Sequence, residues 1–294
     1  MISKMPKGAV IVNAFWRGGD AGAEKLSAVL SLLGITAPVL KSTDLSLYVS
    51  EGVQGEIPFD FAVYLDKDDH FARLLEARGV RLFNSAESIR LADDKMLTHI
   101  ALAPYVRQPK TISSPLFFAG EEDPAFLDRV EQELSYPIVV KKCFGAFGKQ
   151  VYLAKDRNSL VSLRSQLIKE PHIYQQFIPC DSSDIRVITI GGKAVAAMKR
   201  KAASPDEFRA NAELGGTGEA IALTPALRTV AESASRALGL EYAGVDLLWD
   251  EKGYLVTEVN SNAHYKLIEE VTGVPVASLY ANYILSELTK GENA

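Results

Sequence analysis

Two carboxylates and an amide near the C-terminal end, Asp246, Glu258 and Asn260, have the residue types and spacing of a cation site. In a β-hairpin that turns halfway between them, Asp246 lies opposite Glu258, and Asn260 shares a face with Glu258 because side chains alternate. Directly opposed residues have Cβ atoms roughly 5 Å apart, and like charges there repel. A cation between them would relieve that repulsion, and hard oxygen ligands favour Mg²⁺ or Mn²⁺. The alternative is a solvated hairpin whose acids face water.

The hairpin is predicted from composition. Its flanks, 244–249 and 254–259, are rich in β-forming residues, and Glu251-Lys252-Gly253 fits a three-residue loop with glycine where φ is positive. That loop predicts the facing pairs Asp250 with Tyr254, Leu248 with Val256, and Asp246 with Glu258.

A second segment offers groups that could bind phosphate. Lys141 lies in a predicted buried strand, 138–142, and Gly145 and Gly148 lie in the turn that follows it. Glycines let backbone amides approach an anion closely, and a lysine adds a point charge. A hairpin with two glycines and surface lysines is the alternative. The sequence has no Walker A motif, which disfavours a P-loop NTPase.

Further donors come from other parts of the chain. Lys95 lies at a predicted helix start, and Arg200, Arg209 and Asn211 lie between the two predicted C-terminal hairpins. The glycine-containing segment 208–216 could close over phosphates and exclude water, or could be a polar linker.

The elements that must position these residues follow two patterns. The first third alternates strands and helices, which predicts a parallel sheet, with strands at 9–15, 60–65 and 80–83 and helices at 21–33 and 70–78. Beyond residue 175 the pattern is antiparallel, because Gly191-Gly192 joins two strands and a helix opens at Thr224-Pro225. We therefore predict domains at 1–90, 91–174 and 175–294.

The composition is that of a soluble globular enzyme. The 294 residues are 47% hydrophobic and 23% charged, with a net charge of −5 that gives no overall attraction to nucleic acid or anionic lipid. Two distant cysteines indicate reduced thiols. No apolar run is long enough for a membrane span and the start lacks a secretory signal, so we expect a cytoplasmic location.

Taken in order, these pieces resemble the ATP-grasp superfamily, and within it the RimK-like carboxylate-amine ligases. The resemblance extends from about Ser85 to the C-terminus. Its order and spacing are more specific than any single piece. The residues that carry it are Asp94-Lys95, Pro137 to Lys141, Gly145, Gly148, Gln175 to Ile178, Asp184-Ile-Arg186, Ala196 to Arg200, Phe208 to Asn211, Gly215-Gly216, Ala243 to Asp246 and Glu258 to Ser261.

The resemblance implies a Rossmann-like N-terminal α/β domain followed by two α+β lobes that clasp ATP. Carried over residue by residue, it implies that Lys95 and Lys141 bind the ATP phosphates, beneath a loop from Gly145 to Gly148. It gives the remaining roles as follows: Gln176 and Phe177 at adenine, Asp184 at ribose, Arg209 and Asn211 at ATP or the reacting carboxylate, and Asp246, Glu258 and Asn260 on two Mg²⁺ or Mn²⁺ ions.

The implied activity is ATP-dependent amide formation through an acylphosphate. The partners would be a carboxylate and an amine from an amino acid such as glutamate, a peptide or a protein tail, and the enzyme could be a homo-oligomer. Arg200 and Arg209 are the candidate catalytic residues, since a guanidinium grips a carboxylate or an acylphosphate bidentately.

The sequence departs from the family pattern near the reacting centre. Ser261 to Lys266 stands where glutamate ligases commonly have Ala-Ser-Pro-Gly, and Gln176 stands where they commonly have Glu. Two alternatives therefore stay open: a ligase or peptide-tailoring enzyme with a non-glutamate substrate, and a nucleotide-binding module without turnover.

Overall fold

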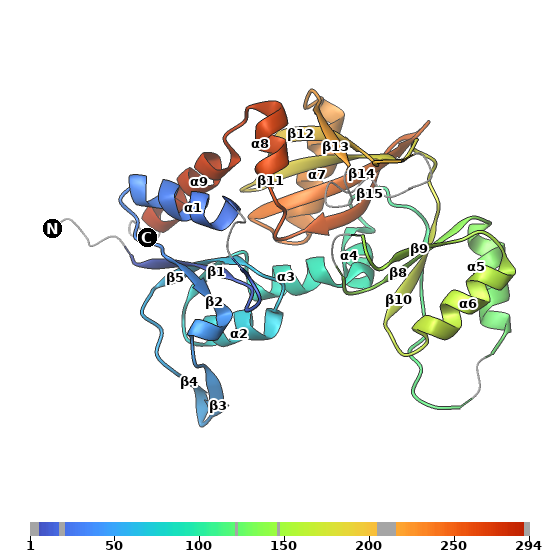
Figure 1. Ribbon diagram of the computed structural model, residues 1–294, viewed down its shortest axis with the longest axis horizontal. Helices are drawn as coiled ribbons and strands as arrows, with labels where there is room; N and C mark the ends of the chain where they lie inside the picture. The colour runs from blue at the N-terminus through green and yellow to red at the C-terminus, as the bar shows by residue number, and fades with distance from the viewer. Residues whose placement is uncertain (1–5, 18–20, 121–122, 146–147, 205–215, 291–294) are drawn as a thin grey trace.

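The structure, a computed structural model, describes residues 6–17, 21–120, 123–145, 148–204 and 216–290. Within these residues the strands form sheets of four, four and five strands and a separate two-stranded hairpin. Figure 1 shows the three larger sheets side by side along the longest axis, with the five-stranded sheet in the middle.

The N-terminal sheet is wholly parallel, which confirms the prediction from the alternating pattern. Its strands, in spatial order, are β2 (Val39–Lys41), β1 (Gly8–Val12), β5 (Phe61–Leu65) and β6 (Arg81–Phe83). The strand predicted at 9–15 ends earlier, because Asn13 starts a turn: its carbonyl accepts from Trp16 N at 2.9 Å, and its side chain accepts from Phe15 N at 2.9 Å. The hairpin of β3 (Tyr48–Ser50) and β4 (Gly52–Gln54) projects from this part.

Helices cover both faces of this sheet. Val10 and Val12 point into a core with α1 (Ala21–Leu32) and α9 (Val276–Lys290), whereas Ala9 and Ile11 point into a core with the helices of the other face. Those helices are α2 (Asp69–Ala77) and α3 (Ala86–Asp93). Burial on both faces explains why β1 is an unbroken apolar run in the sequence.

The first of these cores also extends into the C-terminal part. Tyr280 of α9 is 1% exposed and stacks on Tyr242 with 4.8 Å between ring centroids. The helix that ends the chain therefore shares its core with the strands that begin it. The domain boundaries at 90 and 174 stay predictions.

The second sheet and its helices form a separate lobe. The sheet is antiparallel, with strands β7 (Thr111–Ser113), β10 (His172–Gln176), β8 (Ile138–Lys142) and β9 (Val151–Ala154) in that order. Its outer face carries α5 (Ala125–Leu134) and α6 (Arg157–Leu167), whose apolar sides pack on Ile138, Val140 and Tyr174.

The five-stranded sheet is antiparallel as predicted. Its strands are β13 (Thr217–Ala220), β12 (Lys193–Lys201), β11 (Ser183–Ile190), β14 (Tyr242–Asp250) and β15 (Gly253–Asn260). The helix α7 (Pro225–Ala237), capped by Thr224, contacts β11 and β15, while α8 (Lys266–Thr272) contacts β12 and β13.

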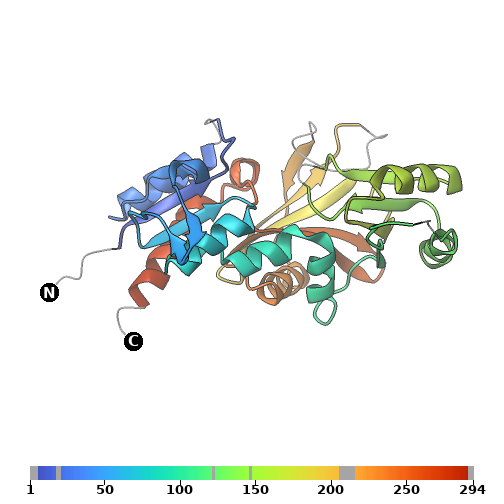
Figure 2. The same ribbon diagram turned by 90° about the horizontal axis from the view of Figure 1, so that it is seen from below.

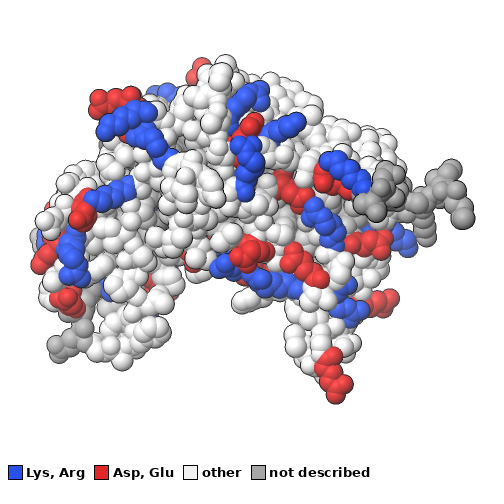
Figure 3. Space-filling model, turned by 180° about the vertical axis from the view of Figure 1, so that it is seen from behind, with Lys and Arg blue, Asp and Glu red and all other residues white. Residues whose placement is uncertain are grey.

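The helix α4 (Lys95–Leu102) links the parts. It contacts α3, α7, β10 and β15 and so connects the three larger sheets (Figure 2). On the face drawn in Figure 3, basic and acidic side chains are interspersed. Among the described residues, no helix is long and apolar enough to cross a membrane.

Two leucines of α1 give a matched test of the first core. Leu30 is fully buried, whereas Leu32 in the same helix is 86% exposed. We expect Leu30→Ala to lower the free energy of unfolding by about 2–5 kcal/mol through lost burial and a residual cavity. We expect Leu32→Ala to change it by less than about 0.5 kcal/mol. Urea unfolding of both variants measures the difference, and equal stabilities would contradict the packing of α1.

Candidate active site

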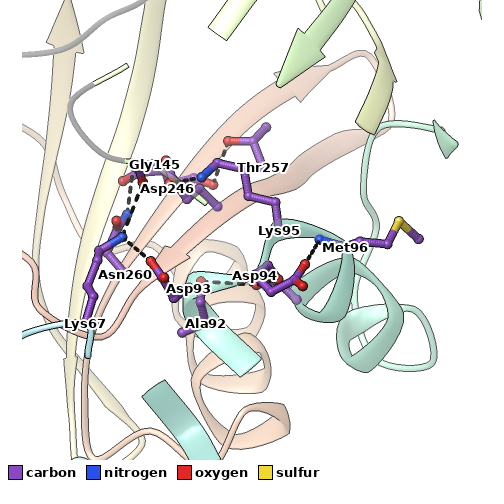
Figure 4. Close-up of polar contacts among 12 residues, drawn as sticks. Lys67, Ala92, Asp93, Asp94, Lys95, Met96, Gly145, Asp246, Thr257 and Asn260 are labelled. Atoms are coloured by element: carbon purple, nitrogen blue, oxygen red, sulfur yellow. Dashed lines mark hydrogen bonds and ion pairs between the residues drawn. The ribbon is translucent and has the colours of Figure 1, made fainter. Parts of the chain in front are cut away.

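The two acids of the C-terminal hairpin face each other. Asp246 on β14 pairs with Glu258 on β15, and Gly244 pairs with Asn260. The Asn260 amide nitrogen lies 3.5 Å from Asp246 Oδ2 (Figure 4). The predicted juxtaposition of two carboxylates and an amide is therefore confirmed.

The route to that pairing differs from the prediction. The loop has two residues, because Gly253, with φ at +116°, pairs with Asp250 in place of Tyr254. Leu248 consequently pairs with Leu255 and not with Val256, so these two predicted pairs are wrong. A β-bulge at Thr257 then restores the register before Glu258. The shorter turn and the extra residue cancel, and the bulge brings Thr257 and Glu258 to one cavity wall.

Asp246 is buried and held by two arginines. Arg186 donates to both of its oxygens, from Nε at 2.7 Å and from a terminal nitrogen at 2.6 Å. Arg200 lies 3.0 Å from Asp246 Oδ2 and also grips Asp184 bidentately, at 2.7 and 2.5 Å. Only 6% of the Asp246 side chain is exposed, so this network carries its charge in place of water.

Glu258 is surrounded by lysines. The Lys95 ammonium lies 3.4 Å from its Oε1. The side chain of Asp94 caps α4 by accepting from Met96 N at 2.9 Å, and Lys95 N donates to Cys143 O at 3.1 Å. The helix start thus fixes the lysine between the acid hairpin and the strand that carries Lys141.

These charges shift one another's titration. Burial alone would raise the pKa of Glu258, but the combined attraction of Lys95, Lys67 and Lys141 outweighs burial and lowers that pKa to about 2. Burial lowers the pKa of Lys141 to about 8, against the attraction of Glu258. The site therefore concentrates positive charge around a carboxylate that stays ionised, as a site for a polyanion requires.

The glycine-bearing turn closes one side. A side chain at Gly145 would put a Cβ atom 2.6 Å from Gln150 Oε1, and Gly148 has φ at +69°. A side chain at Gly145 would displace the Gln150 side chain, and the positive φ of Gly148 favours glycine there.

The remaining predicted residues lie around the same space. A cavity of about 1190 Å³ opens between the three parts, and Lys141, Gly148, Gln176, Phe177, Asp184 and Arg200 line it together with Asp246, Glu258 and Asn260. Gln176 ends β10, where its side chain accepts from Lys110 N at 3.4 Å. Arg209 and Asn211 lie outside the described residues.

Sequence reasoning gave no role to two cations at this site. Arg186 lies two residues after Asp184, the strand partner of Arg200, and faces Asp246 directly across β11 and β14. That relation depends on the pairing of β11 with β14, which the strand order reveals. Lys67 comes from the N-terminal part and reaches Asp93 at 2.8 Å and Gly145 O at 3.4 Å (Figure 4). No pattern in the sequence indicated it.

The donor set suits a hard divalent cation. Two carboxylates face each other beside the Asn260 amide, whose nitrogen lies against Asp246, although no group of three or more His, Cys, Asp or Glu side chains that could hold a metal gathers within the described part of the chain. Oxygen ligands of this type are those of Mg²⁺ and Mn²⁺. An ion at Asp246 would share that carboxylate with Arg186 and Arg200 or displace them.

An acid hairpin facing lysines and a glycine turn across a clasped cavity is the arrangement of an ATP-grasp ligase. The sequence model of the RimK-like ATP-grasp domain matches residues 92–284. The chain belongs to the RimK-like ATP-grasp family.

Curated relatives include ligases and a synthase. A protein of Hahella chejuensis named probable alpha-L-glutamate ligase 2 is 32% identical over 255 residues, which cover 84% of this chain and 82% of that protein. Human N-acetylaspartylglutamate synthase A is 32% identical over 232 residues, covering 77% of this chain and 58% of that protein.

Solved structures agree in fold. The RimK domain protein of Sphaerobacter thermophilus has a TM-score of 0.74 at 20% identity, covering 94% of this chain and 98% of that one. D-alanine–D-alanine ligase of Bacillus anthracis, in a complex with ATP, has a TM-score of 0.71 at 17% identity and covers 98% of both chains. These likenesses confirm the mixed α/β ATP-grasp fold.

The network around Asp246 predicts a stability difference. In Asp246→Ala, Arg186 and Arg200 lose the carboxylate they share in a buried site, and we expect the free energy of unfolding to fall by about 3–5 kcal/mol. Asp250→Ala on the same strand removes only exposed contacts, with the Arg107 guanidinium and with Lys252 N in the turn, and should change stability much less. Chemical denaturation compares them; similar losses in both would contradict the role of Asp246 as the shared counter-charge.

Proposed function

We propose that this ligase uses ATP to activate a carboxylate as an acylphosphate and joins it to an amine, with an amino acid such as glutamate as one substrate. The observation that carries the proposal is the cavity wall itself. Asp246 and Glu258 line the cavity together with Lys141, and the Lys95 ammonium lies 3.4 Å from Glu258 Oε1. A nucleotide with bound metal would complement both kinds of charge.

The chemistry needs little covalent work from the protein. A substrate carboxylate attacks the γ-phosphoryl group of ATP and releases ADP, and an amine then attacks the acyl carbon and releases phosphate. Lys95 and Lys141 would neutralise charge on the transferred phosphoryl group, and Arg200 would align the carboxylate bidentately. Arg209 and Asn211 keep their proposed roles at ATP or the reacting carboxylate.

Two Mg²⁺ or Mn²⁺ ions would be held by Asp246, Glu258 and Asn260. Bound there, they would supply positive charge to the phosphate oxygens. Gln176 and Phe177 would hold adenine from the end of β10, Gly145 to Gly148 would cover the phosphates, and Asp184 would receive the ribose. Asp184 already accepts two bonds from Arg200, so ribose would share that carboxylate.

The identity of the amino acid or peptide that is joined is a separate question. The names of two relatives, an alpha-L-glutamate ligase and N-acetylaspartylglutamate synthase A, support an amino acid substrate that includes glutamate. His264, Tyr265 and Lys266 line the cavity where the sequence departs from the glutamate-ligase pattern, and they favour a second candidate with a different small amino acid or peptide. Incubation with ATP and pools of amino acids, followed by ADP release and product mass, separates the two.

Glu258 offers the sharper test of the acid pair, because its loss leaves the network of Asp246 intact. We expect Glu258→Ala to lower kcat by about 10³-fold or more, since charge on the transferred phosphoryl group is no longer balanced. Glu251→Ala, in the turn of the same hairpin, is the control and should keep parental activity. ADP release measures both, and a Glu258→Ala enzyme as active as its control would refute the metal assignment.

Two consecutive lysines on β8 test the nucleotide site. Lys141 lines the cavity, whereas Lys142 lies 3.6 Å from Glu170 outside it. We expect Lys141→Ala to weaken ATP binding at least about tenfold by removing a charge-assisted contact, and Lys142→Ala to leave it unchanged. Isothermal titration with a nonhydrolysable ATP analogue gives the affinities. Equal binding by the parent and Lys141→Ala would remove that lysine from the site.

A further inference from the structure

The N-terminal sheet contributes its own wall to the cavity. β1 continues through α1 to β2 on one side, and β5 continues through α2 to β6 on the other, so the connections diverge between β1 and β5. Open α/β sheets bind ligands beyond the carboxyl ends of the strands at such a switch point. Asn13 and Asp66 directly follow β1 and β5, and both line the cavity.

Asp66 is a buried carboxylate with neutral partners. It is 6% exposed and accepts from Lys67 N at 2.7 Å and from the Asn13 amide at 3.1 and 3.2 Å. The Asn13 carbonyl end accepts from Phe15 N, which turns its amino end toward Asp66. The carboxylate is thus oriented, but its charge is not neutralised.

No cation of the described residues forms an ion pair with Asp66. The neighbouring Lys67 points elsewhere, to Asp93 at 2.8 Å. A buried carboxylate without a counter-charge costs free energy, and burial raises the pKa of Asp66 against the hydrogen bonds from Asn13 and Lys67 N. A cation bound from the cavity would remove that cost.

Asp66 also lies close to the proposed ATP site. Asn262 donates to Leu65 O at 2.7 Å, which fastens the end of β5 to the segment that follows Asn260. Lys67, next in sequence to Asp66, reaches Gly145 O in the phosphate-side turn. The carboxylate therefore lies on the N-terminal side of the cavity, between the acid hairpin and the glycine turn.

The same cavity offers donors for a second group. The indole Nε1 of Trp16 is buried without a hydrogen-bond partner in the described structure. The Lys266 side chain also lines the cavity, is exposed, and forms no ion pair among the described residues. The Asp66 carboxylate can accept hydrogen bonds from an ammonium group, and the two donors can bind a carboxylate. Together they suit a molecule that has both an ammonium and a carboxylate.

We propose that Asp66, oriented by Asn13, binds the ammonium group of a free α-amino acid, the amine substrate of the ligation, whose carboxylate faces Trp16 and Lys266. This inference rests on the proposed function, because it assigns the amine substrate to the same cavity. Asp66 is a substrate-binding residue and takes no part in ATP binding.

Binding measurements test it without knowledge of the product. The protein is saturated with Mg²⁺ and a nonhydrolysable ATP analogue and titrated calorimetrically with each of the twenty L-amino acids, then with the N-acetyl derivative of each that binds. Acetylation removes the ammonium, so we expect the parent to bind the derivative at least about tenfold more weakly. Asp66→Asn should bind the free amino acid at least about tenfold more weakly and should no longer distinguish it from its derivative.

The control is Asp68→Asn, two residues further on. Asp68 caps α2 by accepting from Phe71 N, and asparagine caps equally well, so this variant should bind as the parent does. Three outcomes overturn the inference: no amino acid binds the nucleotide-loaded parent, Asp66→Asn binds with parental affinity, or the parent binds N-acetyl derivatives as tightly as free amino acids. Failure of the ATP analogue to bind the parent is a different result and refutes the proposed function itself.

Discussion

The repulsion between the facing carboxylates of Asp246 and Glu258 is the constraint on which the rest of the structure depends. Two like charges across a strand pair destabilise a hairpin, and burial adds the free-energy cost of removing both charges from water. Cations from distant parts of the chain offset this repulsion. They are Lys95 from α4, Lys141 from β8, Arg186 from β11, Arg200 from β12 and Lys67 after β5. The acids and cations thus form a site in which charge is balanced before any substrate enters.

That balance has a consequence for ligand binding. Arg186 and Arg200 occupy oxygens of Asp246 that a divalent ion would also need. A metal nucleotide bound there would compete with Arg186 and Arg200 for these oxygens, and a displaced guanidinium group could bind a carboxylate or a phosphoryl group.

Much of this arrangement could be read from the sequence. Alternation along two strands put Glu258 opposite Asp246 and Asn260 on the same face as Glu258, and the alternating pattern of the N-terminal third predicted a parallel sheet. The turn was misjudged because a two-residue loop and a bulge at Thr257 compensate each other, and a bulge leaves no reliable mark in a short apolar run.

Other parts of the site depend on tertiary contacts. Arg186 faces Asp246 through pairing of β11 with β14, strands separated by α7, so its role follows only once the strand order is known. Lys67 and Asp66 reach the cavity because the N-terminal sheet docks on the C-terminal part through α9 and Asn262. Local sequence patterns carry no information on such docking.

The central claim is that Asp246, Glu258 and Asn260 hold metal against the phosphates of ATP. A crystal structure with Mg²⁺ and a nonhydrolysable ATP analogue tests it most directly. The account predicts metal density bridging the phosphates and the oxygens of these three residues, with at least one arginine withdrawn from Asp246. Nucleotide bound in the cavity with no metal at the hairpin, and with Arg186 and Arg200 still on Asp246, would contradict it.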